Sequence, residues 1–587
     1  MRLTLVFLFL TLTRATDTLL VTGSRIPRTF PAMTRQVQTI TREEIGYLPA
    51  HSLADILDRI VSMDMQQRGP YGMQTDASIR GATFEQVLIL VDGVRYNNTQ
   101  TGHHHLDLPV ALADIQRIEV LSGHGSAIYG ADAFGGVINI VTQRGKKDNF
   151  RTRVALAEHS TYTAGFRLGR QGDHIGQSLS VERSASDGYW TGTDFKSLIL
   201  GSQFSWDHTK GKARLTARYA DKDFGAYDFY TPGKEMPSRE KTAGRALELA
   251  NTWQTGPVKV ASQAFFRQHY DKFILDRFDP LLYQNEHTTQ GYGVETHIEV
   301  LLPDHGKLAV GVEAASDLIR SSNLGNHQLP RYAVFLEVNS MLSSRLFTDL
   351  GGRLDISAWG KQFSPVLGIS YWPIPVCKVR ASAGRAFRSP SFTELYYQDP
   401  YNQGRASLVP EEAVCGEVGV DLVREGWQAG TNIFFRHQRN LIDWVHLTTA
   451  DTIWRAINTG QTDIIGWEVS GSIEYRVITA RLNYTLLHLE SNNRYTSKYA
   501  FRFARHHLSA SIGPAGKPRV RPVITASYKA RPDEGHYLVL NAKVSTRLTK
   551  KLDCYIEGTN LLDEDYEAVT GVPQAGRWLG AGIGFRL

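Results

Sequence analysis

Three consecutive histidines, His103, His104 and His105, are the residues of this chain whose type is best suited to chemistry. Neutral imidazole is a common ligand for zinc, copper, iron and nickel. Adjacent side chains of an extended segment cannot all point at one ion, so a role as hydrogen-bonding scaffold residues stays equally open. The ligand-binding surface that we predict combines this run with the polar residues that precede it: Tyr96, Asn97, Asn98, His103, His104 and His105.

Carboxylates form a second candidate site. The long polar segments between expected strands contain five aspartates: Asp187, Asp194, Asp221, Asp223 and Asp228. Carboxylate oxygens are the ligands that calcium prefers, so these segments are a candidate calcium site, and we expect no other cofactor. The three cysteines are far apart and lack C-x-x-C spacing, which predicts neither a zinc site nor a disulfide framework. No grouping of Ser, His and Asp predicts catalysis, and we expect no enzyme activity.

Strict alternation of apolar and polar residues indicates the elements that must position these groups. The segments 212–219, 465–474 and 478–486 each place apolar side chains on one face and charged or hydroxyl side chains on the other. From residue 151 to 587 this pattern predicts about 22 strands, with short breaks such as 208–211 alternating with long ones such as 221–241 and 271–288. The sequence therefore predicts an all-β membrane protein with a 22-stranded antiparallel transmembrane barrel.

Composition and the chain start favour the same class. The net charge is only +6, which does not predict a nucleic-acid surface. Residues 1–15 combine a charged start, a short apolar run and small residues, as a signal peptide does. No segment reaches the roughly 18 apolar residues of a membrane-spanning helix. A soluble protein would need one core for most of this chain, which exceeds the usual size of a domain.

Residues 23–145 differ from the predicted barrel. Ser52 and Asp55 flank the start of an apolar stripe at helical spacing, which predicts a short capped helix. The run 87–91 predicts a buried strand. A barrel of this size leaves an open lumen unless a domain fills it, so we expect an N-terminal α+β plug inside the barrel.

Short motifs carry a family resemblance along most of the chain. They are Ser78 to Gly81, Val91 to Arg95, Tyr129 to Ile140, Arg385 to Ser391 and Asn560 to Asp563. In their order and spacing they resemble the TonB-dependent outer-membrane receptors. Within that family the resemblance is nearest to the cobalamin transporters.

The resemblance implies a function and its partners. It implies a TonB box at residues 16–22 and a barrel from residue 146 to residue 587. It also implies that the protein is a monomer in the lipid of the outer membrane of a Gram-negative bacterium. The box residues are Asp17, Thr18, Leu19, Leu20, Val21 and Thr22. TonB and its inner-membrane energising complex would capture this segment by strand addition and drive uptake of a small metal chelate. Cobalamin is the expected ligand, and a ferric siderophore, haem or a metal is the alternative. A passive porin is an interpretation from a different functional class, and it would lack both the TonB box and the plug.

Overall fold

The computed structural model describes residue 26 and residues 29–143, 149–231, 233–302, 306–448, 450–492, 495–532 and 535–587. The predicted signal peptide and the predicted TonB box lie outside these residues. Within the described part of the chain, no helix is long and apolar enough to cross a membrane.

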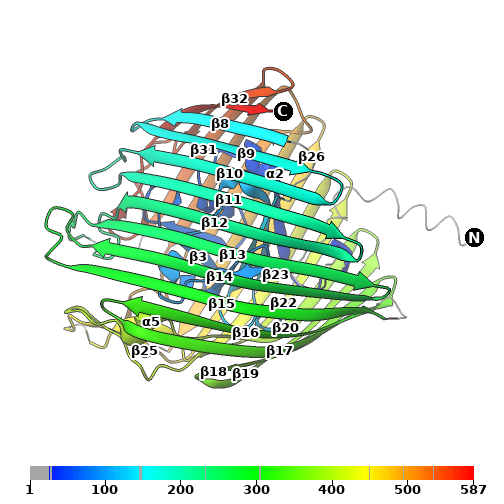
Figure 1. The fold of residues 1–587 in the computed structure, drawn as a ribbon, viewed down its shortest axis with the longest axis horizontal. Helices are drawn as coiled ribbons and strands as arrows, with labels where there is room; N and C mark the ends of the chain where they lie inside the picture. Colours follow the sequence, from blue (N-terminus) through cyan, green and yellow to red (C-terminus); the bar gives the residue numbers. More distant parts are fainter. Residues whose placement is uncertain are drawn as a thin grey trace, which may run out of the picture.

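A closed antiparallel barrel of 22 strands forms the body of the molecule, as predicted (Figure 1). The first half of the wall consists of β8 (Asn149–Ala157), β9 (Thr161–Gln171), β10 (Ile175–Ser186), β11 (Phe195–His208), β12 (Gly211–Gly225), β13 (Arg239–Thr255), β14 (Val258–Ile274), β15 (Gln284–Leu301), β16 (Lys307–Ser321), β17 (Gly325–Ser343) and β18 (Leu346–Ser357). The second half consists of β19 (Gly360–Ile374), β20 (Cys377–Arg388), β22 (Glu411–Arg424), β23 (Trp427–Arg439), β26 (Thr462–Tyr475), β27 (Ile478–Ser491), β29 (His506–Pro514), β30 (Val520–Arg531), β31 (Gly535–Arg547), β32 (Leu552–Thr559) and β35 (Trp578–Arg586). The last strand closes on the first, with Phe585 opposite Thr152.

The two ends of the barrel differ in their connections. At the end where the chain enters β8, consecutive strands are joined by turns such as 209–210 and 256–257; we call this the short-turn end. At the opposite, long-loop end the connections include 226–238 and 275–283. These connections are shorter than the predicted breaks at 221–241 and 271–288. Strands β12 to β15 remain paired beyond the segments in which apolar and polar residues alternate. Polar strand ends outside the lipid need no apolar face, so alternation underestimates their length.

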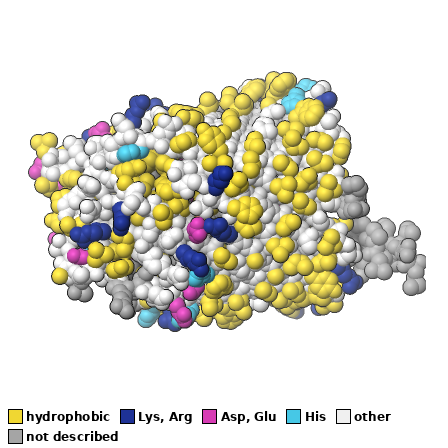
Figure 2. All heavy atoms as spheres, turned by 90° about the horizontal axis from the view of Figure 1, so that it is seen from below, with side chains coloured by type: hydrophobic (Ala, Val, Ile, Leu, Met, Phe, Trp, Pro, Cys, Tyr) yellow, Lys and Arg dark blue, Asp and Glu magenta, His cyan; other side chains and the backbone are white. Residues whose placement is uncertain are grey.

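The two faces of the wall carry the predicted side chains. Leu482 on β27 is 47% exposed on the outer face. Its neighbour Arg481 points inward and forms an ion pair with Glu44 of the N-terminal domain. Figure 2 shows hydrophobic side chains gathered over the part of the barrel nearer the short-turn end, while charged groups are concentrated toward the long-loop end. The outer face therefore matches an apolar band in lipid.

The longest connections fold into structure of their own at the long-loop end. Helix α5 (Phe392–Tyr396) begins at Ser391, whose side chain forms a capping box with Glu394. A four-stranded sheet consists of β21 (Asn402–Gln403), β25 (Trp454–Asn458), β24 (Ile442–His446) and β28 (Thr496–Ser497). A small hairpin consists of β33 (Glu567–Val569) and β34 (Val572–Pro573). Leu395, Ile442 and Trp444 are buried together in one apolar cluster of this region.

The N-terminal domain lies in the barrel lumen, as predicted for a plug (Figure 1). Its strands are β1 (Val37–Thr41), β2 (Met63–Gln67), β3 (Thr75–Ile79), β4 (Val87–Val91), β5 (Val94–Arg95), β6 (Ile115–Ser122) and β7 (Gly136–Thr142). Its helices are η1 (Phe30–Ala32), α2 (Arg42–Tyr47), α3 (Leu53–Leu57), η2 (Pro70–Gly72), η3 (Phe84–Gln86), η4 (Gly102–His104), η5 (Leu112–Asp114) and α4 (Ser126–Tyr129). The predicted helix is α3, with the predicted capping box of Ser52 and Asp55. The predicted strand 87–91 is β4, which is parallel to β7 in a five-stranded sheet.

Candidate functional site

The three histidines lie where the plug meets the long-loop end of the wall. Thr101 caps the single turn η4, and a Cβ on Gly102 would lie 2.6 Å from the Phe84 ring, so glycine permits this close approach. The His103 ring lies 5.7 Å from Tyr230 of the 226–238 loop and 5.5 Å from Tyr499 of the 492–505 loop. The segment is therefore a plug surface that contacts the long loops.

His103 and His105 are fixed as neutral, buried side chains. Nδ1 of His103 lies 2.9 Å from Asp76 Oδ1, and its ring stacks on Phe84 with 4.2 Å between centroids. Both ring nitrogens of His105 lie 3.2 Å from backbone carbonyl oxygens, those of Phe84 and Asn98, and the neutral ring donates to one of them only. Burial lowers the pKa of His103 to about 4, although Asp76 opposes the shift, and burial lowers the pKa of His105 to about 3.

His104 has a different environment from its two neighbours. Its Nε2 lies 3.6 Å from Glu240 Oε1 and 3.5 Å from Asp271 Oδ2. Burial lowers its pKa, but Asp271 and Glu240 outweigh this effect and raise the pKa of His104 to about 9. The three imidazoles thus face three sets of partners, and only His104 joins an acidic pair.

The sequence analysis did not select Glu240 or Asp271 as site residues. Glu240 is the second residue of β13, and Asp271 lies near the end of β14. In the register of these strands Thr242 is opposite Asp271, so Glu240 and Asp271 are diagonal neighbours on the inner face. No linear spacing connects them to His104, and only the placement of the plug in the lumen brings the three together.

The other predicted ligand-binding residues hold the plug together and to the wall. The Tyr96 hydroxyl donates a hydrogen bond to Glu248 of β13. Asn97 accepts from the backbone N–H of Ile89 at 2.7 Å. Nδ2 of Asn98 lies 2.9 Å from Nδ1 of His269 on β14. All three predicted residues are buried, so they position the histidine segment in this state of the plug.

Two of the five predicted loop aspartates lie in a strand. Asp221 and Asp223 belong to β12, opposite Ala243 and Lys241 of β13. The prediction of a loop was wrong here. Strand β12 continues to Gly225 through a polar segment that lacks the alternating apolar face by which strands were recognised. Asp223 Oδ1 accepts from Arg239 Nε at 2.7 Å, so this carboxylate already has a cationic partner.

The remaining three aspartates lie in long-loop connections. Asp194 pairs with Arg239 at 2.9 Å and with Arg277 at 2.8 Å. Asp228 accepts hydrogen bonds from two backbone N–H groups of its own loop, and the backbone N–H of Asp187 donates to a carbonyl oxygen. Across the described ranges, the one group of at least three His, Cys, Asp or Glu residues with converging ligand atoms is His104, Glu240 and Asp271.

A second buried contact joins the plug to another part of the wall. Arg80 Nη1 donates to Glu417 Oε2 at 2.8 Å, and its Nε and Nη2 donate to both oxygens of Glu468 at 2.7 and 2.8 Å. The guanidinium also lies 4.2 Å from the centre of the Phe434 ring. These two carboxylates raise the pKa of Arg80 further above its ordinary value despite burial. Sequence analysis noted Arg80 only as part of a motif.

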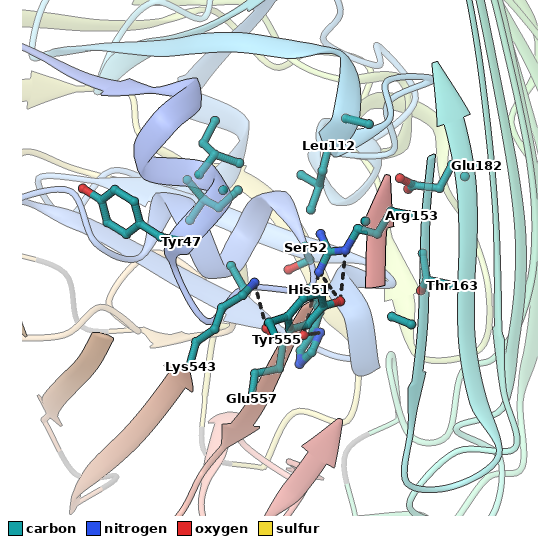
Figure 3. A pocket seen from close by; sticks show the side chains of 18 of the residues that line it. Tyr47, His51, Ser52, Leu112, Arg153, Thr163, Glu182, Lys543, Tyr555 and Glu557 are labelled. Carbon is teal, nitrogen blue, oxygen red and sulfur yellow. Dashed lines mark hydrogen bonds and ion pairs between the residues drawn. The ribbon is translucent and has the colours of Figure 1, made fainter. Parts of the chain in front are cut away.

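A cavity of about 880 Å³ separates the plug from a third part of the wall. It extends from α2 and α3 of the plug to strands β8–β12 and to β30, β31, β32 and β35 (Figure 3). Lys543 Nζ lies 3.1 Å from Glu557 Oε2, and Nε of Arg153 donates to the Tyr555 hydroxyl at 3.0 Å. Most charged side chains in its lining are arginines and lysines, which makes this space suited to anionic or polar groups.

Comparison with known families and proteins identifies the architecture. Residues 142–561 match the model of the TonB-dependent receptor-like β-barrel, and residues 32–137 match that of the TonB-dependent receptor plug domain. The chain is 24% identical to the vitamin B12 transporter BtuB of Vibrio vulnificus, over 94% of this chain and 91% of the relative. It is also 24% identical to BtuB of Vibrio cholerae, over 97% of this chain and 95% of the relative.

Solved structures share the fold. A mutant of the ferric enterobactin receptor PfeA of Pseudomonas aeruginosa matches with a TM-score of 0.82 and 16% identity, covering 97% of this chain and 100% of that one. The siderophore receptor PirA of Acinetobacter baumannii matches with a TM-score of 0.78 and 16% identity, covering 94% and 98%. With the plug, the closed 22-stranded wall and both family models in agreement, the chain belongs to the TonB-dependent receptor family.

Proposed function

We propose that this receptor imports cobalamin across the outer membrane of a Gram-negative bacterium by TonB-coupled active transport. The observation that carries the proposal is the match to curated vitamin B12 transporters along nearly the whole chain, plug and barrel included. The apolar outer face suits a monomer in lipid. The long-loop end would receive the ligand.

The plug contacts support active transport over passive diffusion. Arg80 joins the plug to Glu417 and Glu468 through buried ion pairs. Losing one partner of such a buried pair costs about 3 to 5 kcal/mol, so this contact holds the plug against the wall. A passive porin needs an open lumen, whereas the plug lies across this one (Figure 1).

The coupling segment is tested by a backbone substitution. We propose that TonB and its inner-membrane complex pair with residues 17–22 as an added strand. Leu20→Pro removes a backbone donor, so we expect it to abolish energy-dependent uptake while ligand binding to the purified receptor is unchanged. Leu20→Val keeps the donor and should retain uptake. Uptake that survives both Leu20→Pro and collapse of the proton-motive force would favour a porin.

A ferric siderophore, haem or another metal chelate is the second candidate ligand. The siderophore receptor and the ferric enterobactin receptor that share the fold support it. Equilibrium binding of cyanocobalamin, a ferric catecholate and haem to the purified receptor distinguishes the two. Repeating each titration with calcium and with a chelator tests whether the aspartate-containing loops require the ion. Failure of cyanocobalamin to bind at micromolar concentration, with clear binding of the iron compound, would replace the first candidate.

A further inference from the structure

The contact of His104 with Glu240 and Asp271 has the composition of a metal site. The side chains of all three are at least 95% buried. One nitrogen and two carboxylate oxygens, one atom from each residue, lie within 4.8 Å of one another. A nitrogen and oxygen donor set of this kind suits divalent first-row transition metals such as zinc.

Two carboxylate oxygens at this contact have no hydrogen-bond partner. Among the residues that the structure describes, Glu240 Oε1 and Asp271 Oδ1 are buried without a donor. Leaving a buried charged acceptor unsatisfied is costly. Glu240 Oε1 is also the atom that faces His104 Nε2, whereas Asp271 faces it through Oδ2. A cation bound there by Glu240 Oε1 and by both oxygens of Asp271 would satisfy both unpartnered atoms.

Neighbouring side chains hold the carboxylates in place through their other oxygens. The Tyr230 hydroxyl donates to Glu240 Oε2 at 3.3 Å, and Gln100 Nε2 donates to Asp271 Oδ2 at 3.0 Å. Such contacts around a ligand set orient it and are typical of metal sites. A nearby lysine is engaged elsewhere, since Lys222 Nζ lies 2.5 Å from Asp107 Oδ1.

The distances fit an ion better than a direct pair. His104 Nε2 lies 3.6 Å from one acid and 3.5 Å from the other. These separations exceed the 2.7 to 3.2 Å typical of N–H···O hydrogen bonds. Two ligands that each lie about 2.1 Å from a tetrahedral zinc ion are about 3.4 Å apart. The two separations from His104 Nε2 are therefore close to those of neighbouring zinc ligands, and the ligand atoms of all three residues lie within 4.8 Å of one another.

We propose that His104, Glu240 and Asp271 bind one divalent transition-metal ion, of the zinc type, between the plug and the wall. The ion would bond the η4 turn to β13 and β14 at once, because each of these elements supplies one ligand. An occupied site would link the plug to the wall at the long-loop end. This inference does not depend on which nutrient the receptor imports.

Titration of untagged, chelator-treated receptor in detergent with zinc chloride tests the proposal, by calorimetry and with no cobalamin or siderophore present. We expect one zinc ion per protein at micromolar affinity or tighter, and a tenfold or greater loss in each of H104Q, E240Q and D271N. The two carboxylate variants keep side-chain size and shape, so both should fold. Cobalt chloride gives a second readout, since four-coordinate cobalt absorbs visible light more strongly than the aqueous ion.

Two control variants separate the site from its surroundings. H103Q removes the adjacent histidine, which contacts Asp76 instead, and E286Q removes an exposed wall carboxylate paired with Lys272. Both should bind zinc as the unmodified receptor does. The proposal is overturned if the receptor binds no stoichiometric zinc, or if zinc binding survives unchanged in H104Q, E240Q and D271N. Either outcome would make the three residues a closed ion cluster, and neither would bear on cobalamin uptake.

Discussion

The plug meets the wall through two buried charged contacts that are built differently. At Arg80, one guanidinium donates hydrogen bonds of 2.7 to 2.8 Å to Glu417 and Glu468. At His104, two carboxylates face one imidazole at 3.5 to 3.6 Å, and an oxygen of each remains unpartnered among the described residues. The first contact is complete without any added group, whereas the second leaves buried carboxylate oxygens without a donor, where a cation could bind.

Removing Arg80 should have the largest effect. Arg80→Met leaves two buried carboxylates without their cation, and we expect the free energy of plug unfolding to fall by about 3 to 5 kcal/mol. Hydrogen exchange of the plug strands, in the purified receptor, measures this change. Lys272→Met is the control: it breaks an exposed wall pair and should cost less than about 1 kcal/mol. Equal effects would mean that the Arg80 contact does not hold the plug.

Neutralising one carboxylate at the Arg80 contact and one at the His104 contact should show how differently the two contacts stabilise the plug. Glu468→Gln weakens a charged hydrogen-bond pair, so we expect a loss of about 1.5 to 3 kcal/mol. Glu240→Gln, in metal-free receptor, replaces an acid that shares a single imidazole with a second buried carboxylate, so its effect should be smaller than that of Glu468→Gln. The same exchange experiment compares them. A larger loss for Glu240→Gln would mean that this acid is already fully paired.

The pH dependence of plug stability without metal tests the His104 contact separately. His103 and His105 have folded pKa values of about 4 and about 3, below the ordinary 6.5, so stability falls as pH decreases below 6.5. His104 has a folded pKa of about 9, so its contribution is complete below pH 6.5 and is lost as pH rises toward 9. Calorimetric unfolding between pH 4 and pH 9 should therefore show a maximum near pH 6.5. In His104→Gln the decline above pH 6.5 should become smaller, and an unchanged decline would contradict the assignment.

Alternation and capping predicted the architecture because both are local. Leu482 and Arg481 point to opposite faces of β27, as a period of two requires. Ser52 and Asp55 begin α3 through contacts three residues apart. Strand ends were underestimated wherever polar segments remain paired, and for this reason Asp271 was assigned to a loop.

The candidate site could be predicted only in part. The sequence indicated the three histidines as a polar plug surface, but it could not separate His104 from its neighbours. That separation depends on which wall residues face the plug, and Glu240 and Asp271 come from strands far along the chain. The register of β13 with β14 and the position of the plug in the lumen decide this contact, and neither is encoded in local spacing.

The pairing of β35 with β8 has a consequence for biogenesis. Because the last strand of the wall hydrogen-bonds to the first, no wall shorter than the whole can be sealed. A chain that ends before Trp578 would keep β8 and β32 as two open edges, and unpaired edges in a membrane protein promote misassembly. Synthesis must therefore reach the final residues before the wall can close, and the polypeptide has to be kept from aggregating until then.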